Sequence, residues 1–245
     1  MNAEVAGTSA GACNNCQAPL ASAQQFCGAC GQRAPTNRLT LHDIGHDLLH
    51  AVTHADHSVL SLVAELAINP GNVARDFVSG RRKRHFGPFA FLFIAVAVTT
   101  AIVLITGMNW FIGLNGNPAG QFMQHHLNLV ILVQVPILAG SCAILFRNSR
   151  LNYAEHLILV TYTSGFRVLV MGLIGAPLWF FVKPYVPAAA ALVVYYALWF
   201  SYFCWAASQF YGGNRKWNAA KAFLAALITQ AAAVGLISEF ASLVD

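Results

Sequence analysis

Five apolar segments, each long enough to cross a lipid bilayer, occupy most of the chain after residue 88. A helix rises 1.5 Å per residue, so about 20 apolar residues cross the roughly 30 Å of hydrocarbon. The segments are residues 89–106, 127–146, 157–182, 187–211 and 222–243. Charged residues make up only 9% of the chain and hydrophobic residues 57%, which leaves too little polar surface for a soluble protein. The sequence predicts an all-α integral membrane protein with five transmembrane helices.

The positions of Lys and Arg predict how these helices are oriented. Cytoplasmic loops carry an excess of both residues. With the N-terminus inside, twelve of the 14 Lys and Arg residues fall on the cytoplasmic side, Lys183 falls outside and Arg167 lies within a span. The first forty residues contain no apolar run typical of a signal peptide, so we expect no cleavable leader. We predict a bacterial inner-membrane protein with a cytoplasmic N-terminus and an external C-terminus. This topology accounts for the excess of basic residues that gives the net charge of +5. The charge therefore gives no separate argument for nucleic-acid binding, and we expect no nucleic-acid partner.

Two C-x-x-C pairs, separated by ten residues, lie near the start of the chain. Four thiolates at this spacing suit tetrahedral zinc, and cytoplasmic thiols stay reduced, so the pairs predict a metal site rather than disulfides. Redox motifs of the thioredoxin type lie on a βαβ pattern that this segment lacks, so we favour structural Zn²⁺ over redox or iron chemistry. The metal ligands would be Cys13, Cys16, Cys27 and Cys30. Cys142 and Cys204 have no partner of matching spacing, and we expect them to pack as small apolar residues.

Two amphipathic helices are predicted between the cysteines and the first span. The first covers residues 40–68, where apolar residues recur at helical spacing. The second begins at Asn69-Pro70, a capping residue before a proline, and ends at Gly80. Their apolar stripes must be buried, so we expect both helices to lie along the membrane, against the bilayer interface or the cytoplasmic ends of the spans. The chain then divides into a zinc-ribbon head (1–34), an interfacial region (35–85) and a five-span domain (86–245).

Histidines recur at every fourth position of the first of these helices. They are His42, His46, His50 and His54. Neighbours at this spacing are within reach of one metal ion, but steps of four residues drift around a helix by about 40° each, so the four cannot share one ion. We favour a solvated or headgroup-facing surface over a second metal site or a pH-sensing site.

A run of basic residues directly precedes the first span. It consists of Arg81, Arg82, Lys83 and Arg84, followed by His85. Such a cluster attracts anionic lipid by about 1 kcal/mol per cation. The same run also fixes topology, which is enough to explain it.

Arg167 is a charge predicted to lie inside the membrane. It is the eleventh residue of the third segment, about 15 Å from the cytoplasmic start of that segment. An unpaired charge there is costly, so Arg167 either bonds to polar groups such as Gln134, Gln230 or carbonyls near Pro136, or it binds an anion or lipid headgroup in a cavity. Glu155 and His156 lie at the cytoplasmic mouth of this segment, where they are expected to pair with each other or with Arg150 and to mark an entrance.

The order of these motifs resembles a bacterial family of uncharacterised membrane proteins, known as a domain of unknown function. The likeness rests on the cysteine pairs, on Arg38-Leu39-Thr40, on Asn69-Pro70-Gly71 and on the run from Gly80 to Phe89, and it covers about the first ninety residues. The resemblance implies a polytopic membrane protein with a four-cysteine zinc ribbon in front. A more distant likeness of architecture is to the Yip-type five-span proteins, which interact with small GTPases and shape membranes. Those proteins also have a polar turn that opens the third span, here residues 152–156.

No catalytic motif is evident, so we expect a protein that is not an enzyme. We favour a membrane adaptor or organiser whose head and surface helices bind a partner protein or anionic lipid. The alternative is a small transporter or channel with an anion or lipid-headgroup site at Arg167. A lipid-modifying enzyme that uses His85 or His156 ranks lowest. Gly172 and Ala176 are spaced to permit close helix contact, and a homo-oligomer is left open.

Overall fold

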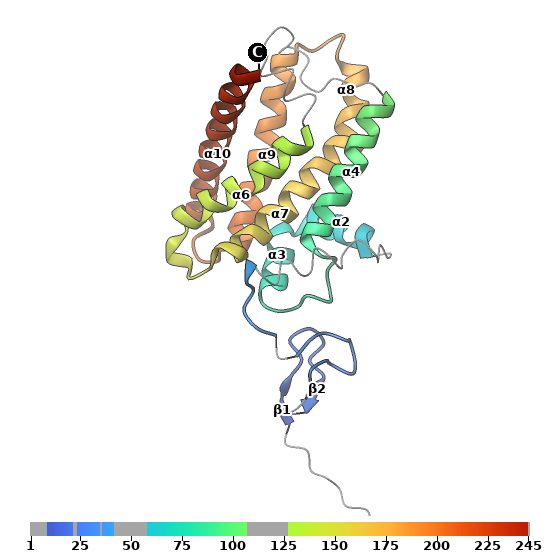
Figure 1. Ribbon diagram of the computed structural model, residues 1–245, viewed down its shortest axis with the longest axis vertical. Coiled ribbons are helices and arrows are strands. Elements are labelled where there is room, and N and C mark those ends of the chain that lie inside the picture. The colour runs from blue at the N-terminus through green and yellow to red at the C-terminus, as the bar shows by residue number, and fades with distance from the viewer. Residues whose placement is uncertain (1–8, 22–23, 35, 42–57, 107–126, 245) are drawn as a thin grey trace, which may run out of the picture.

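A small ribbon lies at one end of a bundle of long helices (Figure 1). The computed structural model describes residues 9–21, 24–34, 36–41, 58–106 and 127–244. The ribbon and the final turns of the last helix lie at opposite ends of the bundle (Figure 1). Most of the described residues are helical, as the sequence predicts.

The described elements are two strands and a series of helices. The strands are β1 (Ser9–Ala12) and β2 (Pro19–Ala21), which pair in antiparallel orientation. The α-helices are α2 (Ser58–Ile68), α3 (Pro70–Val78), α4 (Pro88–Thr106), α6 (Leu127–Leu145), α7 (Tyr153–Val170), α8 (Ala176–Val182), α9 (Ala188–Phe210) and α10 (Arg215–Val244). A 3₁₀ turn, η2 (Arg147–Ser149), precedes α7, and a π-helical turn, η3 (Met171–Gly175), joins α7 to α8.

Four helices are long and apolar enough to cross a membrane. Among the described residues they are Pro88–Thr106, Tyr153–Val182, Ala188–Phe210 and Arg215–Leu236. These four match the predicted first, third, fourth and fifth spans. At the predicted second span, α6 forms, and its described apolar stretch is the shorter segment Val130–Leu145. Pro136 lies inside α6, and its carbonyl accepts a hydrogen bond from the Tyr153 hydroxyl at 3.0 Å.

The third span begins four residues earlier than the hydrophobic pattern predicts. The Asn152 side chain accepts a hydrogen bond from the Glu155 amide at 2.9 Å, and the Glu155 carboxylate accepts one from the Asn152 amide at 2.8 Å. This reciprocal pair satisfies two of the amides that every helix start leaves without partners. The helix can therefore begin on polar residues, before the apolar run from which the third span was predicted.

Helices α2 and α3 pack against the ends of the spans. Leu62, Leu66 and Phe77 are buried in one core with residues of α4, α7 and α9. The sequence predicts that the apolar stripes bury against the bilayer interface or against the ends of the spans. In the structure these side chains pack against the ends of the spans. The predicted helix over residues 40–68 is described only from Ser58, so His42, His46, His50 and His54 lie outside the described residues.

Helix α3 and the end of α9 satisfy each other's free backbone groups. Asn69 precedes Pro70 as predicted, but its side chain makes no capping hydrogen bond, so the expected cap is wrong. Instead the Gly71 amide donates to Gln209 Oε1 of α9 at 2.9 Å. In return Arg75 donates to the Phe210 carbonyl, through Nε at 3.0 Å and Nη2 at 2.7 Å. A cation on the last carbonyls of α9 also suits the negative end of its dipole.

Glycines allow α7 and its continuation to approach α4 closely. A Cβ atom at Gly165 would lie 2.9 Å from the Phe91 ring, and one at Gly172 would lie 2.5 Å from Thr99 Oγ1. Thr99 donates to the Val168 carbonyl at 3.0 Å. Gly172 and the buried Ala176 therefore serve packing within the chain.

We expect Gly71→Ala to destabilise the protein, because α3 lies too close to α9 for a side chain. A Cβ atom at position 71 would overlap the Ala206 carbonyl oxygen and lie 2.6 Å from the Gln209 Cβ. Moving α3 away should cost about 2 kcal/mol of unfolding free energy, seen as a lower midpoint of thermal unfolding followed by tryptophan fluorescence in detergent. Gly140→Ala is the matched control, because a Cβ there meets nothing within 4 Å. Equal midpoints for the two variants would contradict this account.

Candidate functional site

Two matching turns bring the four cysteines together. In the first, the Cys13 amide donates to the Ala18 carbonyl and the Gln17 amide donates to the Cys13 carbonyl, both at 2.9 Å. In the second, Cys27 and Gly31 repeat the same two bonds, at 2.7 and 2.8 Å, with the Gln32 carbonyl in the place of Ala18. The fifth residue of each turn has a positive φ, 62° at Gln17 and 69° at Gly31. This conformation is easy for glycine and uncommon for glutamine.

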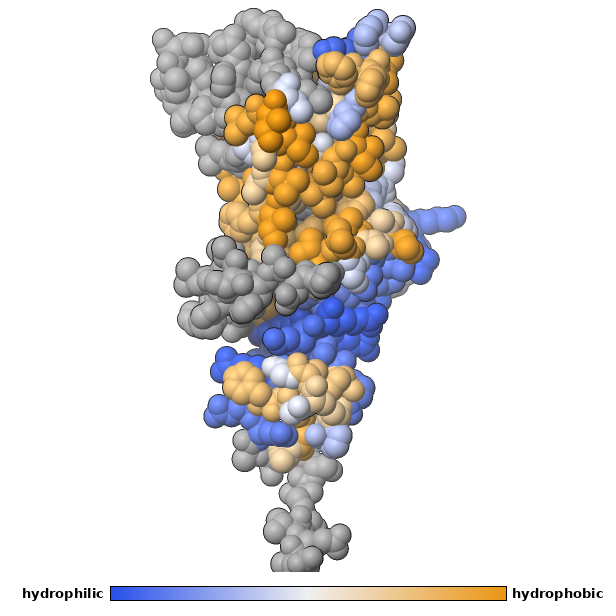
Figure 2. All heavy atoms as spheres, turned by 90° about the vertical axis from the view of Figure 1, so that its right-hand side faces the viewer, coloured by the Kyte–Doolittle hydropathy of each residue, from blue (hydrophilic) through white to orange (hydrophobic). Residues whose placement is uncertain are grey.

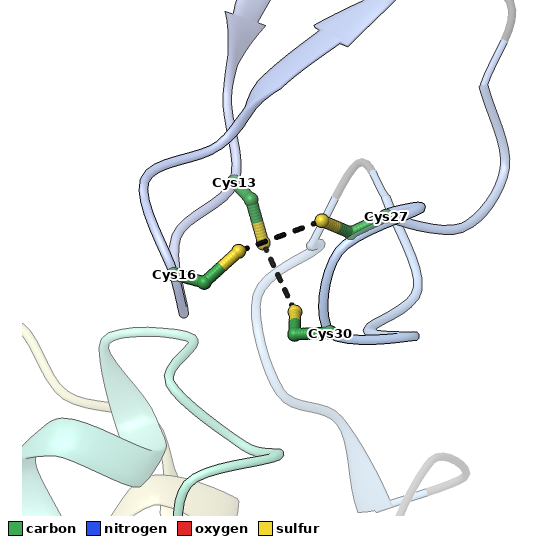
Figure 3. A group of neighbouring side chains, drawn as sticks. All are labelled: Cys13, Cys16, Cys27 and Cys30. Carbon is green, nitrogen blue, oxygen red and sulfur yellow. Dashed lines mark hydrogen bonds between the residues drawn. The ribbon is translucent and has the colours of Figure 1, made fainter.

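The four sulfur atoms converge on one point (Figure 3). All lie within 4.8 Å of one another. The shortest approaches join the two turns, Cys16 to Cys27 at 3.5 Å and Cys13 to Cys30 at 3.7 Å. Four thiols at this separation could hold a single metal ion, as the spacing predicts. Within the described residues this is the one group of Cys, His, Asp and Glu side chains placed to do so.

Backbone amides lower the pKa of two of these thiols and so favour their thiolate forms. The amide of Gln32 lowers the pKa of Cys30 to about 6, and the amides of Cys30 and Ala29 lower the pKa of Cys27. At Cys16 the Ala18 amide acts in the same direction, but burial and hydrogen bonds to the neighbouring thiols outweigh it and raise the pKa to about 12. Negative charge on some sulfurs therefore hinders ionisation of the last. A bound cation would relieve that repulsion.

The side chain of Gln32 fastens the ribbon (residues 9–34) to the basic run (residues 81–84). Gln32 is buried, with 4% of its surface exposed. Its Nε2 donates to the Gly80 carbonyl at 2.7 Å, and its Oε1 accepts from the amides of Arg82 at 3.1 Å and Lys83 at 3.3 Å. Gln32 is two residues from Cys30, so the metal site and the basic run are connected through one short piece of chain. The sequence analysis missed this link.

The basic run lies between the ribbon and the bundle. Figure 1 shows the α3–α4 connection there, and Figure 2 shows a hydrophilic layer between the ribbon and the apolar band of the bundle. Arg81 and Arg84 approach the Asp76 carboxylate at 3.3 and 3.6 Å, yet 44% and 55% of their side chains stay exposed. Both cations therefore remain accessible beside the apolar band of the bundle.

Glu155 pairs with Arg38 instead of Arg150 or His156. Arg38 Nε donates to Oε1 at 2.9 Å and Nη2 donates to Oε2 at 2.8 Å, while Nη2 also donates to the Arg150 carbonyl at 2.7 Å. The Asn152 side chain donates to the carbonyl of the next linker residue, Leu39, at 2.8 Å. We call this set of contacts the linker clamp. It holds the segment after the ribbon against the start of α7.

The two histidines considered for catalysis are both buried. His156 is 1% exposed, and its Nδ1 lies 2.7 Å from the Tyr211 hydroxyl. The His85 ring lies between α2 and α3, with Nδ1 3.0 Å from Glu65 Oε2 and Nε2 3.7 Å from Asp76 Oδ2. Burial lowers the pKa of His85 despite these carboxylates. Neither ring is open to a lipid substrate in this arrangement. Cys142 is also fully buried, while Cys204 is partly buried.

Arg167 lies among polar side chains inside the bundle. Its Nη2 donates to Gln134 Oε1 at 3.1 Å, one of the partners that the sequence suggests. Gln230, the other suggested partner, lines the same cavity but donates to the Tyr196 hydroxyl at 2.9 Å. The guanidinium also lies over the Trp199 ring, 4.5 Å from its centre, an attractive cation–π contact that the sequence analysis missed.

One family model matches part of the chain. A family model described as a protein of unknown function (DUF3667) matches residues 59–100. The matched range contains most of α2, all of α3, the basic run and the first part of α4. It overlaps the later part of the range over which the sequence resembles a family of unknown function. No curated protein matches the chain, and no solved structure matches it. The likeness to Yip-type proteins stays a prediction.

We expect the purified protein to carry one metal ion per chain. Cys27→Ser with Cys30→Ser should abolish it, because two remaining thiols cannot close a tetrahedral site. Elemental analysis by mass spectrometry gives the stoichiometry, and Co²⁺ replacement should give the intense visible bands of tetrahedral thiolate ligation. Cys142→Ser should leave metal content unchanged, since Cys142 is buried in the bundle away from the four thiols. Metal content that is unaffected by the ribbon variants would contradict the assignment.

We expect the linker clamp to protect the segment after the ribbon from cleavage by protease. In Glu155→Gln the bond to Arg38 loses one of its two charges, which should weaken the clamp. Trypsin cleavage after Arg38, followed by mass spectrometry on the folded protein, should then become several-fold faster. Cleavage after Arg33, whose side chain is not part of the clamp, serves as the control within the same digest. An unchanged rate at Arg38 would show that the clamp does not restrain the linker.

Proposed function

We propose that the protein is a non-enzymatic membrane adaptor of the bacterial inner membrane. Its ribbon, folded around structural Zn²⁺, binds a partner protein on the cytoplasmic side. The basic run binds anionic lipid at the membrane surface beside the ribbon. The helical bundle holds this assembly in the bilayer.

The observation that carries this proposal is the buried contact of Gln32 with the basic run. A ribbon tethered only by a flexible linker would sample many orientations, whereas Gln32 and the linker clamp attach this one at two places. Because the ribbon is already ordered in the free protein, binding of a partner does not carry the entropic cost of ordering it. A fixed head with its own metal-stabilised fold is suited to docking.

Zinc is the metal that this site fits best. All four candidate ligands are thiols, and four thiolates close a tetrahedral shell with no position left for a substrate. Zn²⁺ has no redox chemistry, which suits a site built for structure. Iron also binds four thiolates, so the metal analysis above decides between them.

Five membrane crossings are supported by where the ends of the described chain lie. The ribbon and the final turns of α10 are at opposite ends of the bundle, as an odd number of crossings requires (Figure 1). Helix α6 would cross with its partner helices α7 and α10, although its described apolar stretch is shorter than a full span. The clustering of Lys and Arg on the ribbon side supports a cytoplasmic N-terminus.

The transport alternative has weaker support. The cavity beside Arg167 measures only about 10 Å³, which accommodates a ligand the size of one water molecule. A lipid headgroup or a metabolite would require the surrounding helices to separate. An adaptor requires no such movement.

The adaptor is tested by crosslinking in membranes of the native host, followed by purification of the full-length protein and proteomics. We expect a partner protein to be captured with the intact chain and with Cys142→Ser, but not with Cys27→Ser, Cys30→Ser at equal expression. Gln32→Ala, which leaves the thiols in place, should retain metal and reduce capture. Arg167→Gln should capture the partner normally. If the captured proteins are the same with and without an intact ribbon, the adaptor proposal is wrong.

A further inference from the structure

Arg167 has hydrogen-bonding capacity that the bundle leaves unused. Its Nε is buried and has no partner, while Nη2 bonds to Gln134. With α7 starting at Tyr153, Arg167 is the fifteenth residue of the helix, about 21 Å from its start. That depth is beyond easy reach of water for an arginine side chain.

No carboxylate in the described part of the bundle is close enough to neutralise this charge. Glu65, Asp76 and Glu155 form ion pairs at the ribbon end of the bundle. Glu155 is twelve residues before Arg167, about 18 Å along α7. Glu239 lies nine residues beyond Gln230, which lines the cavity, about 13 Å farther along α10. The positive charge therefore has no anionic partner supplied by these helices.

The cavity beside Arg167 presents further donors. Ser164 lines it, is 3% exposed and has no hydrogen-bond partner among the described residues. Gln134 accepts from Arg167 through its oxygen, so its amide N–H groups remain to donate. Two other lining groups are already engaged, since Thr229 donates to the Ala225 carbonyl at 2.8 Å and Gln230 donates to Tyr196.

We propose that this cavity binds one small inorganic anion of halide size, such as chloride. Three donors, the Nε of Arg167, the hydroxyl of Ser164 and the amide of Gln134, surround a space with a net positive charge. The small volume of about 10 Å³ favours a monatomic anion over phosphate and lipid headgroups, which would require the surrounding helices to separate. The anion would neutralise Arg167 and bridge α6 and α7. This role is independent of the ribbon and of the adaptor function.

The position of Trp199 provides a direct readout of binding. Iodide quenches tryptophan fluorescence on contact, and the Trp199 ring lies against the guanidinium that would hold the ion. With protein purified in halide-free gluconate buffer at constant ionic strength, iodide should quench in two components. One component should saturate as the site fills, and the other should rise linearly through the exposed Trp217. Chloride should displace the saturable component, while sulfate and phosphate should not.

Variants separate the site from the reporter. Trp199→Phe should lose the saturable quenching yet keep a chloride-dependent rise in the midpoint of thermal unfolding. Ser164→Ala should weaken iodide binding by about tenfold or more, the loss of one hydrogen bond to a charged group. Arg167→Gln should abolish both responses, with the metal content of the ribbon as the check that the chain is folded. If Arg167→Gln does not fold, chloride competition in the intact chain and the Ser164→Ala shift still decide.

Three results would overturn the proposal. Quenching that is linear at all iodide concentrations means that the cavity holds only water. Displacement by sulfate or phosphate as strong as that by chloride means that the site opens to larger anions, including lipid headgroups. A saturable component that Ser164→Ala leaves unchanged places the halide elsewhere.

Discussion

The carboxylate of Glu155 connects the start of α7 to the linker that follows the ribbon. It closes the capping box that starts α7 and at the same time accepts two hydrogen bonds from Arg38. A buried carboxylate is stable only when its lone pairs are satisfied, and here a backbone amide and a guanidinium satisfy them together. The start of the most buried span and the path of the linker are thus determined by one side chain. The ribbon then lies where the linker and Gln32 place it.

A layer of polar contacts separates this ribbon from the apolar bundle. It contains α2, α3 and the basic run, and the family match of residues 59–100 covers this layer and the first part of α4. Its contacts run both ways: Gln32 reaches it from the ribbon, while Gln209 and the Phe210 carbonyl reach it from α9. Such a layer couples the position of the ribbon to that of the bundle through contacts on both of its sides. The proposed adaptor requires such coupling if a partner bound to the ribbon is to affect the membrane helices.

Features that depend on local pattern were predictable from the sequence. The bounds of α4 and α9 follow from apolar length, those of α3 follow from Asn69-Pro70 and Gly80, and convergence of the thiols follows from their spacing. The start of α7 was readable too, because Asn152 and Glu155 have the spacing of a capping box. Partners far apart in sequence were not predictable: Arg38 and Glu155 are 117 positions apart, and either could pair with many other charges. The need for glycine at position 71 likewise depends on where α9 ends.

The polar groups of the bundle show why Arg167 is exceptional. Thr161 and Thr163 each donate to a carbonyl of their own helix one turn back. Such bonds satisfy a hydroxyl without requiring any neighbour, so these residues place no demand on how the helices pack. A guanidinium has five donors and cannot be satisfied by its own helix. Gln134 and Trp199 meet part of that demand from α6 and α9, and the remainder faces a cavity. The charge therefore ties the packing of these helices to whatever occupies that space, and the anion proposed above would be a structural component of the bundle.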